Sequence, residues 1–409
     1  MDAFYASVEL LRYPELRGQP VVIGGGRRHQ PEEVVDPVSG AAVRRFATLR
    51  GYAGRGVATT ATYEARKLGL HSAQGLMKAA ALAPDAILLP TDFDRYRHFS
   101  RLFKAAVREI APRIEDRGID EIYIDLTDVQ LASDELVAWS GARGTAIAGD
   151  AEADAEAGVD AGAAAPIESE VDAWWRARDV AKALKVAVRE ATGLSCSIAV
   201  APNKLLAKIA SELDKPDGLT IVKPADVPIR IWPLPPRRIN GIGPKASARL
   251  DELGITSIGQ LARADVAWLM EKFGRNYGAW LHRVAHGQDD REVVTESEPV
   301  SISRETTFER DLSARRDRAE LSAIFTELCE SLAGDLARKG YAGRTVGIKL
   351  RFDNFRTVTR DQTLDAPIKD AQAIRRAAGL CLKRAPLERR IRLLGVRMAS
   401  LAPLKGGGG

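Results

Sequence analysis

One run of sequence decides how this chain is interpreted: Gly118-Ile119-Asp120-Glu121-Ile122-Tyr123-Ile124-Asp125-Leu126-Thr127. Its adjacent carboxylates, Asp120 and Glu121, stand directly before an apolar stretch with the pattern of a buried strand. Two carboxylates this close repel each other unless a cation lies between them, and Mg²⁺ combines such oxygen ligands with waters and substrate phosphates. A two-metal site can activate an attacking hydroxyl and stabilise a pyrophosphate leaving group. The alternative is a turn that carries two solvated acids.

The segments around this run alternate between strand-like and helical apolar spacing, which predicts a mixed α/β domain. Two segments interrupt the pattern. Residues 140–172 are rich in alanine, glycine and acids, with too little aliphatic bulk to offset the entropy of ordering, so we expect a disordered insertion. Residues 27–55 are polar, and we expect a loop insertion there. The expected strands are 21–23, 87–89, 122–126 and 195–200, and the expected helices are 61–68, 96–110, 180–192 and 204–213.

The C-terminal half contains two further parts. Residues 239–245, Ile-Asn-Gly-Ile-Gly-Pro-Lys, lie between short apolar-periodic stretches and indicate a small helical module. From residue 299 onward, a β-α-β-β-α-β order predicts a small α+β domain. The glycines at 406–409 are typical of a flexible linker. The α+β domain has expected strands at 301–308, 346–352 and 391–398 and expected helices at 321–338 and 370–384.

The composition indicates a multidomain protein without a membrane span. Its 409 residues exceed what one hydrophobic core usually supports, so roughly two to four domains are expected. There is no apolar run of about 18 residues or more, and the N-terminus lacks the basic and apolar blocks of a signal peptide. The distant Cys196, Cys329 and Cys381 suit buried thiols in a reducing compartment. We therefore expect a cytoplasmic protein.

Basic charge is concentrated towards the C-terminal end. The chain has a net charge of +5, but residues 300–409 hold 22 Lys and Arg against 13 Asp and Glu, a net of +9. The remainder has 38 basic and 42 acidic residues, a net of −4. This asymmetry favours a polyanionic partner such as nucleic acid, and the alternative is an ordinary solvated surface.

Four more sequence blocks accompany the Asp120-Glu121 run. In order, the five blocks resemble the signatures of Y-family DNA polymerases, the translesion class, and most closely its bacterial DNA polymerase IV branch. The resemblance covers nearly the whole chain except the two insertions. It implies a low-fidelity polymerase without proofreading that adds dNTPs to a primer on a damaged DNA template. The four blocks are Met1-Asp2-Ala3-Phe4-Tyr5-Ala6-Ser7-Val8-Glu9, Thr60-Ala61-Thr62-Tyr63-Glu64-Ala65-Arg66-Lys67, Ala201-Pro202-Asn203-Lys204 and Lys215-Pro216-Asp217-Gly218.

The fold implied by the resemblance is a right-hand polymerase, α/β and α+β in class. The disordered insertion then falls in the palm and the loop insertion in the fingers. The implied partners are primer–template DNA, dNTPs and the sliding clamp, with no membrane, and the implied state is a monomer. No clamp-binding peptide stands out before the glycine tail. The palm is expected at 1–24 and 86–230, the fingers at 25–85, a helix-hairpin-helix thumb at 231–298 and the little finger at 299–405.

The resemblance also implies roles at the active site. Asp120 and Glu121 match the catalytic carboxylates that bind two Mg²⁺ ions, and the backbone carbonyl of Met1 matches a main-chain metal ligand. Tyr5 matches the steric gate, an aromatic ring that leaves no room for a 2′-hydroxyl. Phe4 is expected to help line the sugar pocket. The alternative for both aromatic residues is a place in the core.

Three residues match positions that grip the incoming triphosphate: Tyr63 and Arg66 from the fingers and Lys215 from the palm. A guanidinium offers phosphate oxygens a planar fork, whereas an ammonium acts as a point charge. The alternative for Arg66 is a solvated helix face.

The sequence departs from the family pattern at its start. In the family, an aspartate that bridges both metals ends the first strand immediately before the position of Met1, and here no residue stands there. Asp2 matches a different position. The resemblance therefore implies that the chain as written is inactive, through a misassigned start codon or as a fragment. The rival interpretations are a non-catalytic family member that acts as a DNA-binding scaffold and a nucleotidyl cyclase, whose palm is similar.

DNA contacts are expected from the two C-terminal parts. Gly241, Gly243 and Lys245 form a helix-hairpin-helix pattern, in which glycines let the backbone approach a phosphate and free N–H groups bind it. Because strand side chains alternate, Lys349 and Arg351 share one face, and such a sheet can lie against phosphates without reading sequence. The basic residues expected to contact DNA in the little finger are Arg304, Lys349, Arg351, Arg356 and Arg360.

Overall fold

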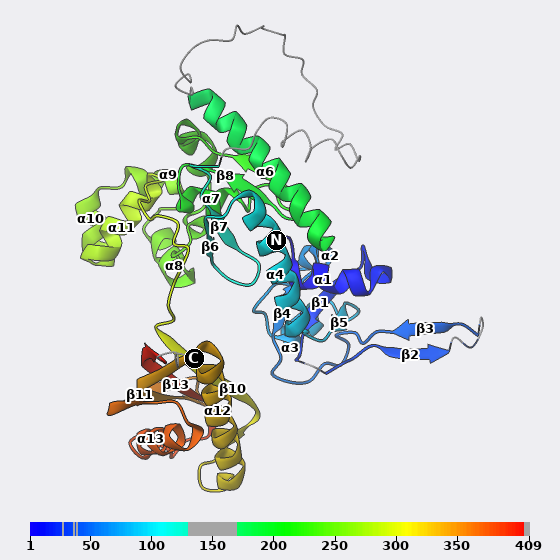
Figure 1. The fold of residues 1–409 in the computed structure, drawn as a ribbon, viewed down its shortest axis with the longest axis vertical. Helices are drawn as coiled ribbons and strands as arrows, with labels where there is room; N and C mark the ends of the chain where they lie inside the picture. Colours follow the sequence, from blue (N-terminus) through cyan, green and yellow to red (C-terminus); the bar gives the residue numbers. More distant parts are fainter. Residues whose placement is uncertain (27, 36, 38–39, 130–169, 405–409) are drawn as a thin grey trace, which may run out of the picture. The chain divides into compact units, whose positions relative to one another are not determined.

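The computed structural model describes residues 1–26, 28–35, 37, 40–129 and 170–404 (Figure 1). The chain divides into two compact units, Met1–Thr295 and Glu296–Gly409. Most of the insertion predicted at 140–172 lies outside the described residues. Its last three residues belong to helix α6 (Glu170–Thr192), which therefore begins ten residues before the predicted start at 180. Among the described residues, no helix has both the length and the apolar character needed to cross a bilayer.

A three-stranded sheet follows the first helix, α1 (Phe4–Arg12), and the single turn η1 (Pro14–Leu16). Its central strand β1 (Val21–Gly24) is antiparallel to β4 (Ala58–Ala61) and parallel to β5 (Ile87–Leu89). The β-branched side chains of β1 are fully buried, as a central strand requires. Two short helices, α2 (Tyr63–Lys67) and α3 (Leu76–Leu82), complete this part, and Leu76 joins Val22 and Leu88 in one apolar cluster.

The segment predicted as a loop insertion, residues 27–55, contains a β-hairpin. Strands β2 (Glu32–Val35) and β3 (Ala42–Arg45) pair antiparallel, with Val34 opposite Val43. Figure 1 shows this hairpin extending away from the three-stranded sheet. Nearly all its side chains are exposed, so it has no buried face and lacks the apolar alternation by which a strand is predicted.

The next part combines two long helices with two separate two-stranded sheets. Helices α4 (Phe93–Ile110) and α6 pack together through an apolar cluster that includes Phe103 and Leu184. Strand β6 (Ile114–Asp116) pairs antiparallel with β7 (Ile122–Ile124), and β8 (Ile198–Val200) pairs parallel with β9 (Leu219–Ile221). Helix α7 (Lys204–Ala210) follows β8 and begins at Asn203, whose side chain accepts a hydrogen bond from the Leu206 amide.

A helical module ends the first unit, as the pattern around residues 239–245 predicts. Short turns lead into it, and its helices pack around an apolar cluster that includes Leu250, Leu261 and Leu281. The turns are η2 (Pro224–Asp226), η3 (Val227–Ile231) and η4 (Pro236–Arg238), and the helices are α8 (Pro244–Glu252), α9 (Ile258–Arg263), α10 (Val266–Phe273) and α11 (Arg275–Ala285).

The second unit has the predicted β-α-β-β-α-β order. Its four strands form one antiparallel sheet in the order β10-β13-β11-β12, and both helices pack on one face through an apolar cluster that includes Phe325, Leu350 and Val396. No helix among the described residues of this unit covers the other face of the sheet. The elements are β10 (Ser301–Leu312), α12 (Arg318–Lys339), β11 (Tyr341–Phe352), β12 (Thr357–Ile368), α13 (Ala371–Lys383) and β13 (Ile391–Pro403).

All three cysteines are buried and unpaired, as their spacing predicts. Burial raises the pKa of the Cys196 and Cys329 thiols to about 11. Both thiols therefore stay protonated near neutral pH.

Candidate active site

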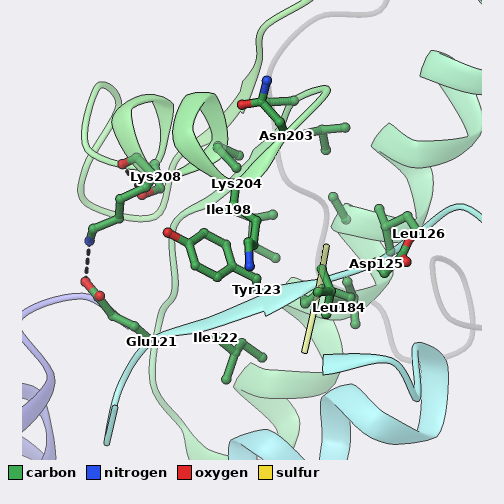
Figure 2. Close-up of a pocket in the computed structure, with 18 of the residues that line it drawn as sticks. Glu121, Ile122, Tyr123, Asp125, Leu126, Leu184, Ile198, Asn203, Lys204 and Lys208 are labelled. Atoms are coloured by element: carbon green, nitrogen blue, oxygen red, sulfur yellow. Dashed lines mark hydrogen bonds and ion pairs between the residues drawn. The ribbon is translucent and has the colours of Figure 1, made fainter. Parts of the chain in front are cut away.

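The predicted carboxylate pair lies directly before β7, close to the N-terminus. The Met1 ammonium donates to the Asp120 carbonyl at 2.9 Å, and Lys208 on α7 forms an ion pair with Glu121 (Figure 2). Burial raises the pKa of Asp120; the Met1 ammonium opposes this shift and the charge of Glu121 adds to it. Additional positive charge would therefore stabilise this pair, which is the electrostatic condition for a bound cation.

The donor atoms at this point fit a hard cation in kind but are few. Two carboxylates and the main-chain oxygen of Met1 are the donors that Mg²⁺ prefers. Within the described parts of the chain, no group of three or more His, Cys, Asp and Glu side chains is placed to hold a metal ion. Waters and substrate phosphates would have to supply the remaining ligands of a Mg²⁺ ion held by Asp120 and Glu121.

Lys215 takes part in a chain of alternating charges beside this pair. Its ammonium lies 2.7 Å from Glu212, which also lies 3.6 Å from Lys208. Burial disfavours ionisation of Glu212, but the hydrogen bond from Lys215 and the charges of both lysines outweigh it and lower the pKa of this carboxyl. Sequence reasoning missed Lys208 and Glu212, although their i,i+4 spacing was a usable signal.

Tyr5 lies within reach of Asp120. Burial raises the pKa of the Tyr5 hydroxyl, and the negative charge of Asp120 raises it further. The Tyr5 ring packs on Tyr96, with 4.5 Å between ring centroids, and on Phe93 at 5.8 Å. Phe4 is only 3% exposed and packs in the core, so its ring can support Tyr5 but has little surface of its own for a ligand.

Tyr63 and Arg66 lie together on α2, whose first turn is capped by the Thr62 side chain. The Arg66 guanidinium lies 4.8 Å from the Tyr63 ring centroid. Burial, together with the charges of Asp2 and Glu212, raises the pKa of Tyr63 to about 12 although Arg66 opposes the shift. Among the described residues, none forms a hydrogen bond with the buried Tyr63 hydroxyl, which is costly unless a ligand accepts a hydrogen bond from it.

The Asp2 carboxylate has hydrogen-bond partners of its own, apart from the carboxylate pair. Its buried carboxylate accepts hydrogen bonds from the hydroxyls of Ser195 and Ser197, at 2.9 and 2.7 Å, and from the Asp217 amide at 2.9 Å. These bonds join the start of α1 to the residues before β8 and to the loop before β9. The structure thus gives Asp2 a bracing position, in line with the prediction that it does not replace a metal ligand.

A cleft of about 630 Å³ opens beside Glu121, between β7 and β8. In Figure 2, Tyr123 and Ile198 line it, with Leu184 of α6 nearby. Within the described strands, β7 pairs with β6 alone and β8 with β9 alone, so each has one edge without a ladder partner. The Met1 ammonium bonds the residue two before β7, and the Asp2 amide donates to the Ser195 carbonyl, three residues before β8. A strand leading into Met1 would therefore run antiparallel to both edges.

Lys204, from the Ala201-Pro202-Asn203-Lys204 block, anchors the end of the first unit. It is buried, and its ammonium lies 2.7 Å from Glu115 and 2.5 Å from the Glu292 carbonyl. Glu115 also accepts a hydrogen bond from the Val294 amide at 3.0 Å. The segment that leaves the helical module is thus tied back to β6 and α7 before the chain enters the second unit.

The predicted helix-hairpin-helix residues lie at the start of α8. Gly241 has a φ of 109°. A Cβ at this position would lie 2.8 Å from the Trp280 ring, and the Gly241 carbonyl accepts a hydrogen bond from Tyr277 at 3.0 Å. Gly243 precedes the helix with open space around it, and Lys245 is exposed in the first turn. The backbone N–H groups of this turn are therefore accessible to an anion.

The predicted basic residues of the second unit do not share one surface. Lys349 and Arg351 alternate with buried residues of β11 and face away from the helices, as predicted. Arg304 instead contacts Asp335 on α12, and Arg360 donates to the Arg384 carbonyl at the end of α13. Both lie on the helix-covered face, because side chains alternate along a strand and each of these arginines is in step with the buried residues of its own strand. Arg356 lies in the turn before β12. Sequence reasoning missed Arg397, which alternation on β13 places on the open face, 2.9 Å from Asp361.

Comparisons with known proteins cover almost the whole chain. A model of the impB/mucB/samB family matches residues 1–212, and a model of that family's C-terminal domain matches residues 299–407. A DNA polymerase IV of Methanoculleus marisnigri is 38% identical over 401 residues, which are 98% of this chain and 92% of the relative. A DNA polymerase IV of Alkalilimnicola ehrlichii is 35% identical over 402 residues, 98% of this chain and 93% of the relative.

A solved structure shares the fold. A chimeric Y-family DNA polymerase superposes with a TM-score of 0.71 at 21% sequence identity, covering 98% of this chain and 97% of the other. Identity this low supports a shared fold rather than shared details of the site.

Proposed function

Because the chain belongs to the impB/mucB/samB family, we propose that it extends primers past damaged template bases, by transfer of a nucleotide from a dNTP to the primer 3′-hydroxyl. It is a DNA-directed DNA polymerase with the Y-family fold. The observation that carries the proposal is the pair Asp120 and Glu121, which Tyr5 and two lysines approach within one site. In this proposal, residues 1–24 and 86–230 form the palm, 25–85 the fingers, 231–298 the thumb and 299–405 the little finger.

The carboxylate pair is proposed to hold two Mg²⁺ ions, with the Met1 carbonyl as a further ligand. When bound, the ions would supply charge stabilisation for the pyrophosphate and acidify the primer hydroxyl. The chain's own residues position the ligands: Lys208 holds Glu121 in place, and the buried setting of Asp120 strengthens its attraction to positive charge.

The incoming nucleotide is proposed to lie between Tyr5 and the residues Tyr63, Arg66 and Lys215. No residue in the described parts of the chain forms a hydrogen bond with the buried Tyr63 hydroxyl, which supports this placement because a phosphate oxygen could accept one. Arg66 can add a planar pair of donors, and Lys215 can exchange its ion pair with Glu212 for one with phosphate. Tyr5, braced by Tyr96, would exclude a 2′-hydroxyl, and Phe4 would support it from the core.

The cleft beside Glu121 is proposed to receive one further strand that ends immediately before Met1. The unpaired edges of β7 and β8 and the apolar lining support this proposal. Such a strand would join the two small sheets into one, and a residue at its end would lie next to Asp120. An aspartate there is the metal ligand that the family pattern leads us to expect.

DNA is proposed to contact the first turn of α8, through Gly241, Gly243 and Lys245, and the open sheet face around Lys349 and Arg351. These contacts would be made to phosphates, so they suit an enzyme that must copy any sequence. Arg356, at the sheet end, is proposed to join them. Arg304 and Arg360 would need a second DNA contact on the other face. Docking on the sliding clamp and a monomeric state are further proposals from the family.

Primer extension tests the proposed function. The chain is compared with a form that carries a five-residue apolar strand and a terminal aspartate before Met1, each with Mg²⁺, dNTPs and a primer–template. We expect the extended form to lengthen the primer and Glu121→Ala in that form to lower the rate by at least about a thousandfold. Glu252→Ala, on the surface of α8, serves as the control. If neither form extends a primer while both bind primer–template DNA, the chain is a DNA-binding scaffold.

A further inference from the structure

The turn between β11 and β12 exposes an aromatic ring in a strained backbone conformation. Phe355 is 63% exposed and has a φ of 63°. A bulky side chain rarely adopts this left-handed conformation, which strains the backbone. The neighbouring Asn354 is of a residue type that adopts this left-handed conformation more readily than phenylalanine does. Fold stability alone therefore does not explain a phenylalanine here, and backbone strain of this kind is typical of functional surfaces.

The ring is held in position although solvent surrounds much of it. The Phe355 amide donates to the Phe352 carbonyl at 2.9 Å, which closes the turn. The Arg392 guanidinium from β13 lies 4.7 Å from the Phe355 ring centroid, a cation–π contact. A fixed, exposed ring of this kind offers a ready stacking platform.

The surroundings of the ring are strongly basic. Arg351 and Arg356 flank the turn in sequence, and Arg392 contacts the ring. Asp353 accepts a hydrogen bond from Arg389 at 2.9 Å, and its amide donates to the Arg390 carbonyl at 3.0 Å, which brings the 389–392 segment to the turn. Four arginines thus lie at or beside this turn, against one aspartate, so the complementary partner is a polyanion.

We propose that this turn binds single-stranded DNA, with an unpaired base stacked on Phe355 and the neighbouring phosphates held by the arginines. A polyanion with free aromatic faces is the partner that an exposed ring among arginines fits, whereas duplex bases are already stacked on one another. The inference rests on the proposed function in one respect: a template-copying enzyme meets unpaired template. It adds a base-stacking contact to the phosphate contacts of the open sheet face.

The test separates bases from phosphates. The full chain is titrated with a labelled oligothymidylate of about 16 nucleotides and with an abasic oligomer of equal length, which keeps the phosphates. For the unchanged chain we expect tighter binding to the oligothymidylate. Phe355→Asn should remove about five- to a hundredfold of this preference, because base stacking on an aromatic ring is lost. Asparagine suits the left-handed turn, so the variant should fold at least as well.

Three further variants sharpen the result. Phe355→Trp should restore the preference for bases. Arg356→Gln should weaken binding to both oligomers equally and reduce the salt dependence by about 0.7 in log–log slope. Leu380→Asn, at an exposed apolar residue of α13, should leave the preference unchanged.

Two outcomes would overturn the inference. One is a Phe355→Asn chain that keeps the full preference for the oligothymidylate; the other is a loss of affinity confined to a blunt duplex of equal length. This titration measures DNA binding and does not involve primer extension. A failure of the proposed polymerase activity can therefore be distinguished from a failure of the stacking site.

Discussion

Asp2 shows how much one buried side chain can hold together. Its three hydrogen bonds join segments that are 193 to 215 residues apart in sequence, and the residue is only 2% exposed. We expect Asp2→Ala to lower the free energy of unfolding by about 2–4 kcal/mol, because two serine hydroxyls and one amide lose a charged acceptor. Urea unfolding followed by circular dichroism measures this change. Asp2→Asn, which keeps the size, should lose less, and an Asp2→Ala chain as stable as the original would contradict the bracing position.

Glu9 predicts a pH dependence of stability. It is buried, and the Tyr96 hydroxyl donates to it at 2.6 Å. Burial raises the pKa of Glu9, although the Tyr96 hydrogen bond opposes the shift, so the folded state favours the protonated acid. This contribution is complete below the ordinary pKa of 4.5 and is lost as the pH rises through the higher pKa of the folded state.

The unchanged chain should therefore lose stability from pH 5 to pH 7.5 relative to a Glu9→Gln variant, which cannot ionise. The raised pKa of Glu9 fixes the sign of this difference, because only the unchanged chain must ionise a buried acid as the pH rises. Urea unfolding of both chains at the two pH values measures it. A constant difference between the chains across this range would show that Glu9 does not titrate there.

Single residues were predictable where their chemistry is local. From their residue types alone, the adjacent acids Asp120 and Glu121 left a cation site and a solvated turn open, and the raised pKa of Asp120 supports the proposed cation site. The ion pair of Glu121 with Lys208 was not predictable. The two residues lie on different elements, and the sequence does not specify how those elements pack. The same reason applies to Arg304, whose partner Asp335 comes from a helix that covers its strand.

At the scale of elements, the start of α8 depends on one close contact. Gly241→Ala would place a Cβ against Trp280 and force an unfavourable φ, so the turn before α8 must shift. We expect about a tenfold loss of affinity for primer–template DNA at moderate salt, because the N–H groups of the first turn leave their positions. Filter binding or fluorescence anisotropy measures the loss.

Gly254→Ala is the matched control for this change. Gly254 also has a positive φ, 78°, but nothing lies within 4 Å of its Cβ position, and it follows the other end of α8. Gly254→Ala should cost stability only through its positive φ, without changing DNA affinity. Equal affinities of the two variants would remove the first turn of α8 from the DNA contacts.

The elements of the second unit were predicted better than those of the first, where the buried strand β4 and the helix α1 were missed. Three strands and both helices of the second unit follow from their alternation and periodicity, since each buries one face in a common core, whereas β12 follows only from the predicted β-α-β-β-α-β order. The β2–β3 hairpin within 27–55 escaped prediction, because its side chains are exposed on both faces. The early start of helix α6 escaped prediction, because its first turns, around Trp174 and Trp175, follow directly on the alanine-rich segment.

At the scale of the whole molecule, the two units each have their own core and are joined by an exposed segment after Val294. A site for a sequence-specific protease, placed at residues 296–298, should therefore allow cleavage into two folded fragments. We expect the affinity for primer–template DNA to fall by about a hundredfold on cleavage, because the two contacts no longer act at a high effective concentration. Anisotropy before and after digestion of the same sample measures this. Unchanged affinity would mean that one unit carries the whole DNA contact.

The three buried thiols have a practical consequence for spectroscopy. Maleimides react with exposed thiolates, and here every native sulfur is shielded and those of Cys196 and Cys329 hold their protons. A cysteine introduced on an exposed loop of each unit can therefore carry a fluorophore without removal of any native cysteine. Energy transfer between two such dyes would then follow how the units approach and separate as DNA binds.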